Sequence, residues 1–180
     1  MIALRRAAAG DEAQIARVNV EAWQQAYGNH VPKPMAERVT IERRLPMWQA
    51  LIGQHQATHP TWVAVDETAG IVGFVTGSPT GSEIQGLLGE LHMLYVVPGF
   101  QRRDIGRRLF HAMAEGLVAM GGHSAVATVL DAPAALAFCR ALGGVALTET
   151  SIDVAGQPVA ETLFAWRDLA ALPPQPGSDP

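Results

Sequence analysis

The apolar positions of the chain recur with two different periods. Spacings of three and four residues over 12–27 and from Ile105 to Met120 predict two amphipathic helices. Two more helices are expected, one beginning at Thr40 and one at Asp131. Short runs rich in β-branched residues predict strands at 2–6, 62–66, 71–76, 90–97, 124–130, 145–154 and 159–166. The resulting order, β-α-α-β-β-β-α-β-α-β-β, predicts an α/β fold with one central sheet.

Polar residues mark the expected ends of several elements. Asp11 followed by Gln14 has the spacing of a capping box at the first helix. Asp131, with Pro133 in the first turn, is expected to cap the last helix. The run 77–89 is rich in Gly, Ser and Pro, so we expect it to begin as a turn.

Length and composition limit the classes of protein that need to be considered. The chain has 180 residues, of which 48% are hydrophobic and 17% charged, and this fits one globular domain. We expect the domain to span 1–170 and the Pro-rich segment 171–180 to be a disordered tail. The net charge of −4, without a basic run, argues against nucleic-acid binding.

Membrane and disulfide classes are also disfavoured. Uncharged stretches fall short of the roughly 20 residues that a spanning helix needs, and the N-terminus lacks the apolar core of a signal peptide. The single cysteine, Cys139, allows no intrachain disulfide and almost excludes a cysteine-based zinc site. His55 and His59 are four residues apart, but no third ligand is evident, so no metal is expected. We therefore expect a cytoplasmic protein that acts without a membrane.

The segment from Glu90 to Leu109 carries the strongest chemical signal. A predicted strand ends at a Pro-Gly break, and a helix begins a few residues later. A helix N-terminus offers unpaired N–H groups and favours anions. The four arginines at this end are Arg102, Arg103, Arg107 and Arg108. Guanidinium groups match phosphate geometry, so a diphosphate would suit the segment; the alternative is a solvated basic turn balanced by nearby carboxylates.

The run LYVVPGFQRRDIGRRL over 94–109 resembles the coenzyme A signature of the GNAT superfamily of N-acetyltransferases, L-x-V-x-P-x-x-[QR]-x-x-G-x-[GA]. Residues 11–32 resemble the first helices and substrate loop of that family. Residues 131–143, with Phe138, resemble its second motif, N-x-x-A-x-x-F-Y-x-x-x-G. The resemblance implies a GNAT-like single domain with a mixed, mostly antiparallel sheet flanked by helices, and acetyl-CoA as the cosubstrate.

The resemblance also assigns roles to individual residues. Main-chain groups of Val96 would hold the pantetheine arm and the thioester oxygen, and Gly106 would let the backbone approach the phosphates. The cofactor residues implied in this way are Leu94, Tyr95, Val96, Gln101, Arg102, Arg103, Asp104, Ile105, Gly106, Arg107 and Asp131.

Three positions depart from the family pattern. Asp104 replaces the first glycine of the phosphate loop; aspartate tolerates a left-handed backbone better than most residues but adds negative charge beside a pyrophosphate. Asp131 replaces the usual asparagine. Cys139 replaces the tyrosine that commonly acts as general acid toward the leaving thiolate, which predicts a slow enzyme or one that uses water or another acid. Cys139 is otherwise an ordinary buried residue.

An amine acceptor must lose a proton before it can attack, so the site needs a base. Strand alternation places Glu90, His92, Leu94 and Val96 on one face, near the thioester if Val96 marks it. Family members place a base at positions matching Glu90 or His92, so both are catalytic candidates. The alternative is that Glu90 merely ends the strand in solvent and His92 is a hydrogen-bonded core residue.

The acceptor side is less defined. Trp23, Tyr27, His30 and Trp48 lie in the region that would cover the acceptor, although aromatic residues there are more often core. Small-molecule and peptide amines both remain open, and the acidic balance slightly favours a cationic acceptor. Homodimer formation is also open.

These observations predict an acetyl-CoA-dependent N-acetyltransferase that acts on a primary amine by direct attack in a ternary complex. The alternatives are a catalytically weak or inactive CoA-binding, ligand-sensing module, and a structural domain that binds no coenzyme A.

Overall fold

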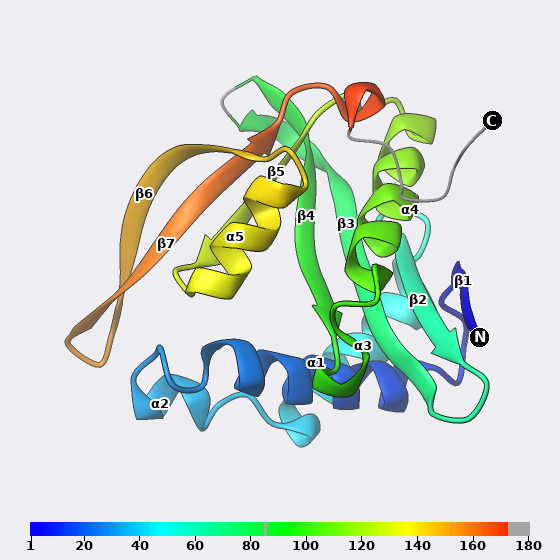
Figure 1. Cartoon of the computed structure of the whole chain (residues 1–180), viewed down its shortest axis with the longest axis horizontal. Helices are drawn as coiled ribbons and strands as arrows, with labels where there is room; N and C mark the ends of the chain where they lie inside the picture. The colour runs from blue at the N-terminus through cyan, green and yellow to red at the C-terminus, as the bar shows by residue number, and fades with distance from the viewer. Residues whose placement is uncertain (85, 173–180) are drawn as a thin grey trace.

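A seven-stranded sheet forms the centre of the computed structural model, which describes residues 1–84 and 86–172 (Figure 1). Its strands are β1 (Ile2–Arg6), β2 (Thr61–Asp66), β3 (Gly70–Ile84), β4 (Leu87–Val96), β5 (Ala125–Leu130), β6 (Val145–Val154) and β7 (Gln157–Trp166). The helices are α1 (Glu12–Tyr27), α2 (Lys33–Ala36), α3 (Ile41–Gln54), α4 (Ile105–Ala119) and α5 (Pro133–Ala141), with short 3-10 turns at Pro98–Phe100 and Leu169–Ala171.

The strand order in the sheet is β1-β2-β3-β4-β5-β7-β6. Only β4 and β5 are parallel, and every other neighbouring pair is antiparallel. The predicted single α/β domain with a mixed, mostly antiparallel sheet is therefore confirmed. The short helix α2 was not expected, because 28–34 was interpreted as a break. Most of the predicted tail, residues 173–180, lies outside the described residues.

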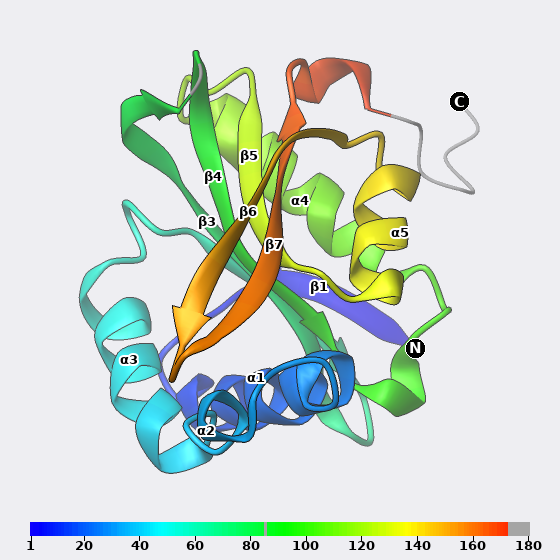
Figure 2. The same cartoon turned by 90° about the vertical axis from the view of Figure 1, so that its left-hand side faces the viewer.

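Helices cover both faces of the sheet (Figures 1 and 2). On one face, Trp48 of α3 packs edge-on against Phe74 of β3, with ring centroids 4.8 Å apart. On the other face, α4 lies so close to β3 that a Cβ at Gly77 would stand 3.2 Å from Met113 Sδ. Glycine at 77 thus serves packing, and the prediction that 77–89 begins as a turn is wrong, because β3 continues to Ile84.

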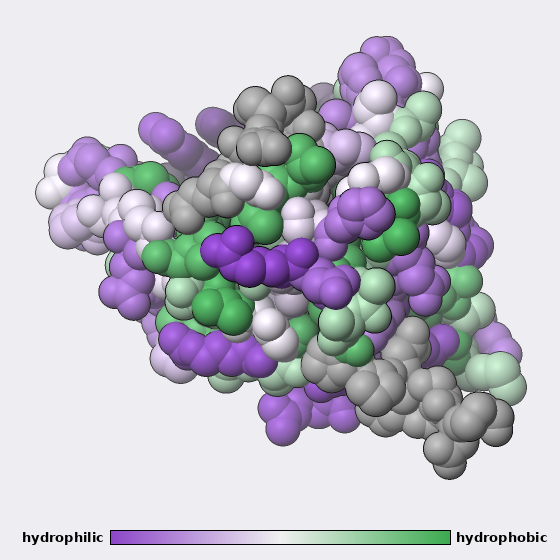
Figure 3. All heavy atoms as spheres, turned by 90° about the horizontal axis from the view of Figure 1, so that it is seen from above, coloured by the Kyte–Doolittle hydropathy of each residue, from purple (hydrophilic) through white to green (hydrophobic). Residues whose placement is uncertain are grey.

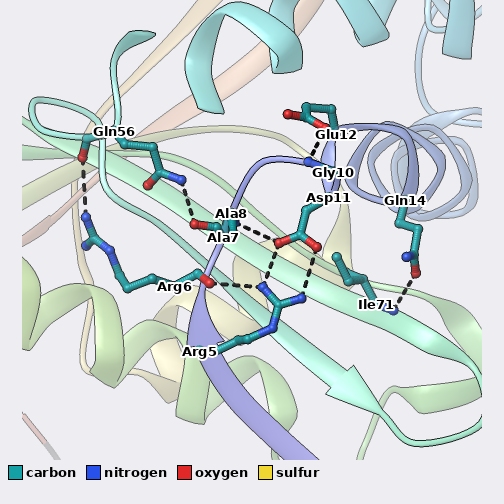
Figure 4. Close-up of polar contacts among 10 residues, drawn as sticks. All are labelled: Arg5, Arg6, Ala7, Ala8, Gly10, Asp11, Glu12, Gln14, Gln56 and Ile71. Carbon is teal, nitrogen blue, oxygen red and sulfur yellow. Dashed lines mark hydrogen bonds and ion pairs between the residues drawn. The ribbon is translucent and has the colours of Figure 1, made fainter. Parts of the chain in front are cut away.

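Helix α1 begins where predicted, but no capping box holds its first turn. The Asp11 carboxylate makes no cap hydrogen bond and instead accepts two hydrogen bonds from Arg5, at 2.6 and 2.9 Å, and one from the Ala8 N–H (Figure 4). The Gln14 side chain accepts a hydrogen bond from the Ile71 N–H at 2.9 Å. These two polar residues therefore tie α1 to β1 and β3, which is a tertiary role that a local motif does not reveal.

The predicted cap of α5 is wrong in the same way. The N-cap residue is Ala132, which makes no side-chain cap hydrogen bond. Asp131 lies one residue earlier, and its carboxylate accepts a 2.7 Å hydrogen bond from the Thr162 hydroxyl of β7. Asp131 therefore joins the start of α5 to the neighbouring strand.

Hydrophilic and hydrophobic residues are interspersed on the face of the molecule seen from above (Figure 3). In the described part of the chain, no helix combines the length and apolar character needed to cross a bilayer.

Candidate active site

The parallel strands β4 and β5 diverge soon after they meet. Their register contains one pair, Glu90 with Val126, so the remainder of β4 has no β5 partner. A cleft of about 440 Å³ opens at this divergence, lined by residues of β4, β5, α1 and α5. Figure 2 shows the arrangement of these elements, with α1 below the two strands and α5 to their right. The walls of the cleft include 91–96 of β4, 127–129 of β5, and residues of α1, α5 and the loop before α4. The main-chain groups of β4 that face β5 are not paired with it beyond Glu90, so an extended ligand can bind along this edge of β4.

A β-bulge interrupts β4 within the cleft. Thr76 of β3 pairs with Met93, whereas the next residue, Gly77, pairs with Leu91. His92 is therefore an extra residue on β4, and such an insertion breaks the alternation of side chains.

Because of the bulge, the prediction that Glu90, His92, Leu94 and Val96 share one face is wrong. Leu94 and Val96 point toward α4, since Leu94 lies beside Gly106 and Val96 lies beside Leu109. Glu90 and His92 do come together, with 3.7 Å between Glu90 Oε1 and His92 Nδ1. The two candidate bases thus form one cluster, separated from the residues that face α4.

His92 lines the cleft, and its ring is held on several sides. Nε2 lies 2.8 Å from Ser78 Oγ, and the ring stacks on that of His59 with centroids 5.7 Å apart. Burial lowers the pKa of His92; the nearby Glu90 carboxylate acts against this and His59 adds to it. His92 is therefore an uncharged imidazole at neutral pH, able to take up a proton.

His92 lies between Ser78 and Glu90, with Ser78 at Nε2 and Glu90 near Nδ1. Sites with a serine nucleophile use the same order of serine, histidine and carboxylate. Ser78, however, is only 6% exposed and does not line the cleft. Glu90 does not line it either, although 37% of its side chain is exposed. His92 is thus the member of this group of three that can meet a ligand in the cleft, with the other two beside it.

The loop before α4 has an unusual backbone. Arg102 and Asp104 both have φ of 61°, in the left-handed region. Asp104, which stands where the motif has glycine, therefore has a left-handed backbone that aspartate tolerates better than most residues, and it is also the N-cap residue of α4. Left-handed residues in such loops turn successive main-chain N–H groups toward one point, which creates an anion-binding concavity.

The four arginines of this region have different surroundings. Arg102 lines the cleft, and its side chain makes no hydrogen bond or ion pair with the described residues. Arg103 lies over an aromatic ring, and Arg108 donates to a main-chain carbonyl of β1. Arg107 Nε lies 3.4 Å from the Asp104 carboxylate. The alternative of a basic turn balanced by carboxylates therefore holds for Arg107, which lies beside Asp104. Arg102 remains available to bind a ligand in the cleft.

The remaining predicted cofactor residues divide into two sets. Those that line the cleft with Arg102 are Leu94, Tyr95, Val96, Gln101 and Gly106. Those that do not line it are Arg103, Asp104, Ile105, Arg107 and Asp131. Ile105 is only 1% exposed, so its side chain belongs to the core and its main chain alone can serve a ligand.

Two close contacts shape the cofactor side of the cleft. The Gln101 side chain donates a 2.9 Å hydrogen bond to the Val96 carbonyl, which leaves the N–H as the main-chain group of Val96 available for the predicted role. A Cβ at Gly106 would lie 3.0 Å from the Phe138 ring of α5. Glycine at 106 is thus needed for the packing of α4 against α5.

Cys139 lies in the wall of the cleft formed by α5 and is 8% exposed. Burial raises the pKa of its thiol to about 11, so it stays protonated at neutral pH. Tyr27 of α1 lines the same cleft, and burial raises its pKa to about 12, with Cys139 adding to the shift. Two neutral, protonated groups therefore stand on this side.

The aromatic residues expected near the acceptor do not all lie there. Tyr27 and His30 line the cleft. Trp48 is fully buried in the core and lines neither of these two cavities, which fits the alternative that it is a core residue. Trp23 lines a second cavity beside α3.

No pattern in the sequence points to Ser78 or His59 as neighbours of His92. They come from β3 and from the segment before β2, and only the fold brings them together. Among the residues that the structure describes, no three His, Cys, Asp or Glu side chains form a group suited to a metal ion.

The chain is similar to several known proteins. The chain is 28% identical over 172 residues to the uncharacterized N-acetyltransferase YuaI of Bacillus subtilis, covering 96% of each chain. The fold matches a GCN5-related N-acetyltransferase from Rhodopseudomonas palustris, with a TM-score of 0.69, 23% identity, and coverage of 91% of this chain and 93% of that one. It also matches YncA from Salmonella typhimurium, a putative acetyltransferase solved with acetyl-CoA, with a TM-score of 0.69, 18% identity and 99% coverage of both chains.

Residues 18–143, more than half of the chain, match the model of the acetyltransferase (GNAT) family. Together with the sheet topology and the cleft at its diverging strands, this match shows that the chain belongs to the GNAT family of acetyltransferases.

Proposed function

We propose that this protein transfers the acetyl group of acetyl-CoA to a primary amine by direct attack in a ternary complex. The observation that carries the proposal is the cleft, where an uncharged histidine and a left-handed, arginine-bearing loop meet beside unpaired main chain. Membership of the GNAT family and the acetyl-CoA bound to YncA support acetyl-CoA as the cosubstrate.

The residues present fit coenzyme A. Main-chain groups of β4 beyond Glu90 are not paired with β5, so they can hold the pantetheine arm. The N–H groups of the left-handed loop and the Arg102 guanidinium suit a pyrophosphate. Bound acetyl-CoA would supply an acyl thioester whose thiol is a good leaving group.

His92 is the proposed base. With its Nε2–H donating to Ser78 Oγ, the Nδ1 atom is free to accept a proton from the amine, directly or through a water. Glu90, 3.7 Å from Nδ1, would stabilise the positive charge that the ring then carries. Glu90 and Ser78 thus act as positioning residues.

The reaction forms one C–N bond and breaks one C–S bond. The amine proton goes to His92, and the departing sulfur, with a thiol pKa of about 8.5, leaves as thiolate and takes a proton from solvent. Cys139 holds the position where the family commonly has a tyrosine acid, and its thiol is protonated at neutral pH.

The first test is the shift in melting temperature with acetyl-CoA, alongside dephospho-CoA and ATP. A ligand at about 100 times its Kd adds roughly 2.7 kcal/mol, which is a shift of several degrees for this size of domain. A saturable shift with acetyl-CoA, followed by amine-dependent release of free thiol, is the expected result. No shift up to millimolar acetyl-CoA would contradict the proposal.

A specific second outcome would favour the ligand-sensing alternative. Asp104, Asp131 and Cys139 all depart from the family pattern. If acetyl-CoA binds but thiol release stays at background over a broad amine panel, the protein binds the cosubstrate without turnover.

A further inference from the structure

A second cavity, of about 400 Å³, lies beside α3 and carries an unusual concentration of positive charge. We call it the arginine pocket, and it is lined by Trp23, Met35, Arg38, Val39, Arg43, Arg44 and Val154. Three of its seven lining residues are arginines, and the other four are apolar. Its walls join Val154 of β6, next to the tip of the β6–β7 hairpin, to Met35 of α2 and to Arg43 and Arg44 of α3.

The three guanidinium groups lack a partner in the part of the chain that the structure describes. Within 1–84 and 86–172, the side chains of Arg38, Arg43 and Arg44 make no hydrogen bond or ion pair. Arg44 Nε is in addition buried without a hydrogen-bond partner there. A buried donor without a partner is costly, and native proteins seldom leave one without a reason.

The acidic residues nearest in the sequence do not neutralise this charge. Glu37 pairs with Lys33 at 3.5 Å, and the Glu42 carboxylate is held by Thr40 and a main-chain N–H. Asp153, next to the tip of the hairpin, accepts a hydrogen bond from the Gly156 N–H. The pocket therefore presents uncompensated guanidinium groups, and an anion would offset their mutual repulsion.

The pocket is rigidly built. Gln24 of α1 donates hydrogen bonds to the carbonyls of Ala36 and Val39, at 2.8 and 3.2 Å, which fixes the segment that carries Arg38. Val39 and Trp23 are buried, at 5% and 6% exposure. A preformed wall of this kind lowers the entropy lost when a ligand binds.

The arginine pocket adjoins the cleft. The ring of Trp23, in the pocket, lies 5.7 Å from that of Tyr27, which lines the cleft. Arg44 also acts electrostatically on Tyr95, another residue of the cleft wall. The two cavities therefore meet at this pair of rings, and the guanidinium groups lie next to the space in which the amine would react.

We infer that the arginine pocket binds the carboxylate of the acceptor, so that the substrate is a small amine bearing a carboxylate and an apolar group, in the class of the amino acids. This inference rests on the proposed function. Guanidinium groups bind carboxylates through paired hydrogen bonds, and the apolar walls formed by Trp23, Met35 and Val154 suit an apolar side chain. The cavity volume is within the range of small-molecule sites.

Calorimetric titration tests the inference without any turnover. The probes are L-methionine, L-leucine and L-phenylalanine, each compared with its carboxamide, in the presence of saturating coenzyme A. We expect at least one acid to bind, with a Kd at least ten-fold lower than that of its amide. Equal affinity for every acid and its amide, or no binding by any acid, would overturn the inference.

Variants locate the binding. Arg38→Gln with Arg43→Gln removes two exposed guanidinium groups and should preserve the fold, whereas Arg44→Gln also removes the buried donor. Both variants should lose the preference for acid over amide. Arg167→Gln, an exposed arginine outside both cavities, is the matched control and should keep it. Undiminished preference in the double variant would contradict the inference.

Two further arms separate the sources of failure. If amides and acids release thiol from acetyl-CoA at equal rates, the acetyl transfer stands and the carboxylate inference fails. If an acid binds with the expected preference but acetyl-CoA does not bind, the proposed function fails. 3-Phenylpropionate, which has no amine, should compete with the amine acceptor; binding without competition would make the pocket regulatory and overturn its assignment to the acceptor.

Discussion

Two groups of arginines border the two cavities, and the fold treats them in opposite ways. At the start of α4, Arg103, Arg107 and Arg108 each contact protein groups, so most of that positive charge is already used. In the arginine pocket, no side chain of the group is paired within the described residues. The arginines at the start of α4 are close together in the sequence, yet fewer of them are available to bind an anion than in the arginine pocket.

The difference indicates two modes of anion recognition. Beside α4, left-handed backbone at Arg102 and Asp104 supplies main-chain N–H groups, and side chains contribute less. In the pocket, the guanidinium side chains would bind the anion. Substitution and salt should therefore affect the two sites differently, because surface guanidinium groups are screened by salt and main-chain donors are less so.

The largest effect is expected in the cleft, and it tests whether the reaction takes place there while the arginine pocket only binds the substrate. His92→Gln removes the proposed base and should lower kcat by roughly 10²–10⁴-fold without changing the Kd of acetyl-CoA. Steady-state thiol release and calorimetry measure the two quantities. A loss below three-fold would remove His92 from the mechanism.

The pH profile sharpens the same test. Burial lowers the pKa of His92 from its usual 6.5, with Glu90 opposing and His59 reinforcing the shift. The reactive neutral form is therefore lost only as the pH falls below 6.5, and kcat should rise with pH to a plateau that is reached before neutrality. Glu90→Gln removes the group that raises the pKa, so the rising limb should move to lower pH, and in His92→Gln this limb should disappear.

The next effect concerns the arginines beside α4. Arg102→Ala should weaken acetyl-CoA binding by about ten-fold, since a hydrogen bond to a charged group contributes roughly 1.5–3 kcal/mol. Arg103→Ala is the matched control next to it, and its guanidinium lies over Phe100, outside the cleft. We expect a change below two-fold for the control. Equal losses in both variants would mean that the whole cluster binds the cofactor as an unspecific basic patch.

Much of the fold was predictable because its signals are local. Helix 12–27 and the strands 2–6 and 145–154 were placed at their observed bounds by periodicity and turn residues. Three of the errors share one cause, which is a tertiary partner that overrides a local rule. Asp11 bonds Arg5, Asp131 bonds Thr162, and Gly77 admits Met113 of α4 against β3.

The site was predictable only as far as one contiguous motif reaches. The motif located Val96, Gln101, Arg102 and Gly106, all of which line the cleft. It could not reveal the bulge at His92, because a bulge depends on the pairing of β4 with β3. The arginine pocket was equally hidden, since it joins two parts of the chain that are far apart in sequence. The net charge favoured a cationic acceptor, whereas the local charge of the pocket favours an anionic group.

A smaller effect tests whether backbone or side chain matters at Asp104. Asp104→Gly keeps the left-handed conformation, removes strain of roughly 1–2 kcal/mol and takes away a carboxylate beside the proposed phosphate site. It also frees Arg107 from its ion pair. We expect a Kd for acetyl-CoA lower by a few-fold and a higher melting temperature. Weaker binding by the variant would show that the carboxylate itself has a positive role, for instance by orienting Arg107.

The smallest effect is expected at Cys139. Its thiol, with a pKa of about 11, is a weaker acid than the coenzyme A thiol by roughly 2.5 pKa units, so proton transfer to the departing sulfur is unfavourable. Cys139→Ser should therefore change kcat by less than about three-fold, and alkylation of the native thiol by iodoacetamide should be slow at pH 7.5 and accelerate as the pH approaches 11. A hundred-fold loss of kcat with an unchanged melting temperature would instead make Cys139 the general acid, and would place an essential proton donor on the side of the cleft that faces Tyr27.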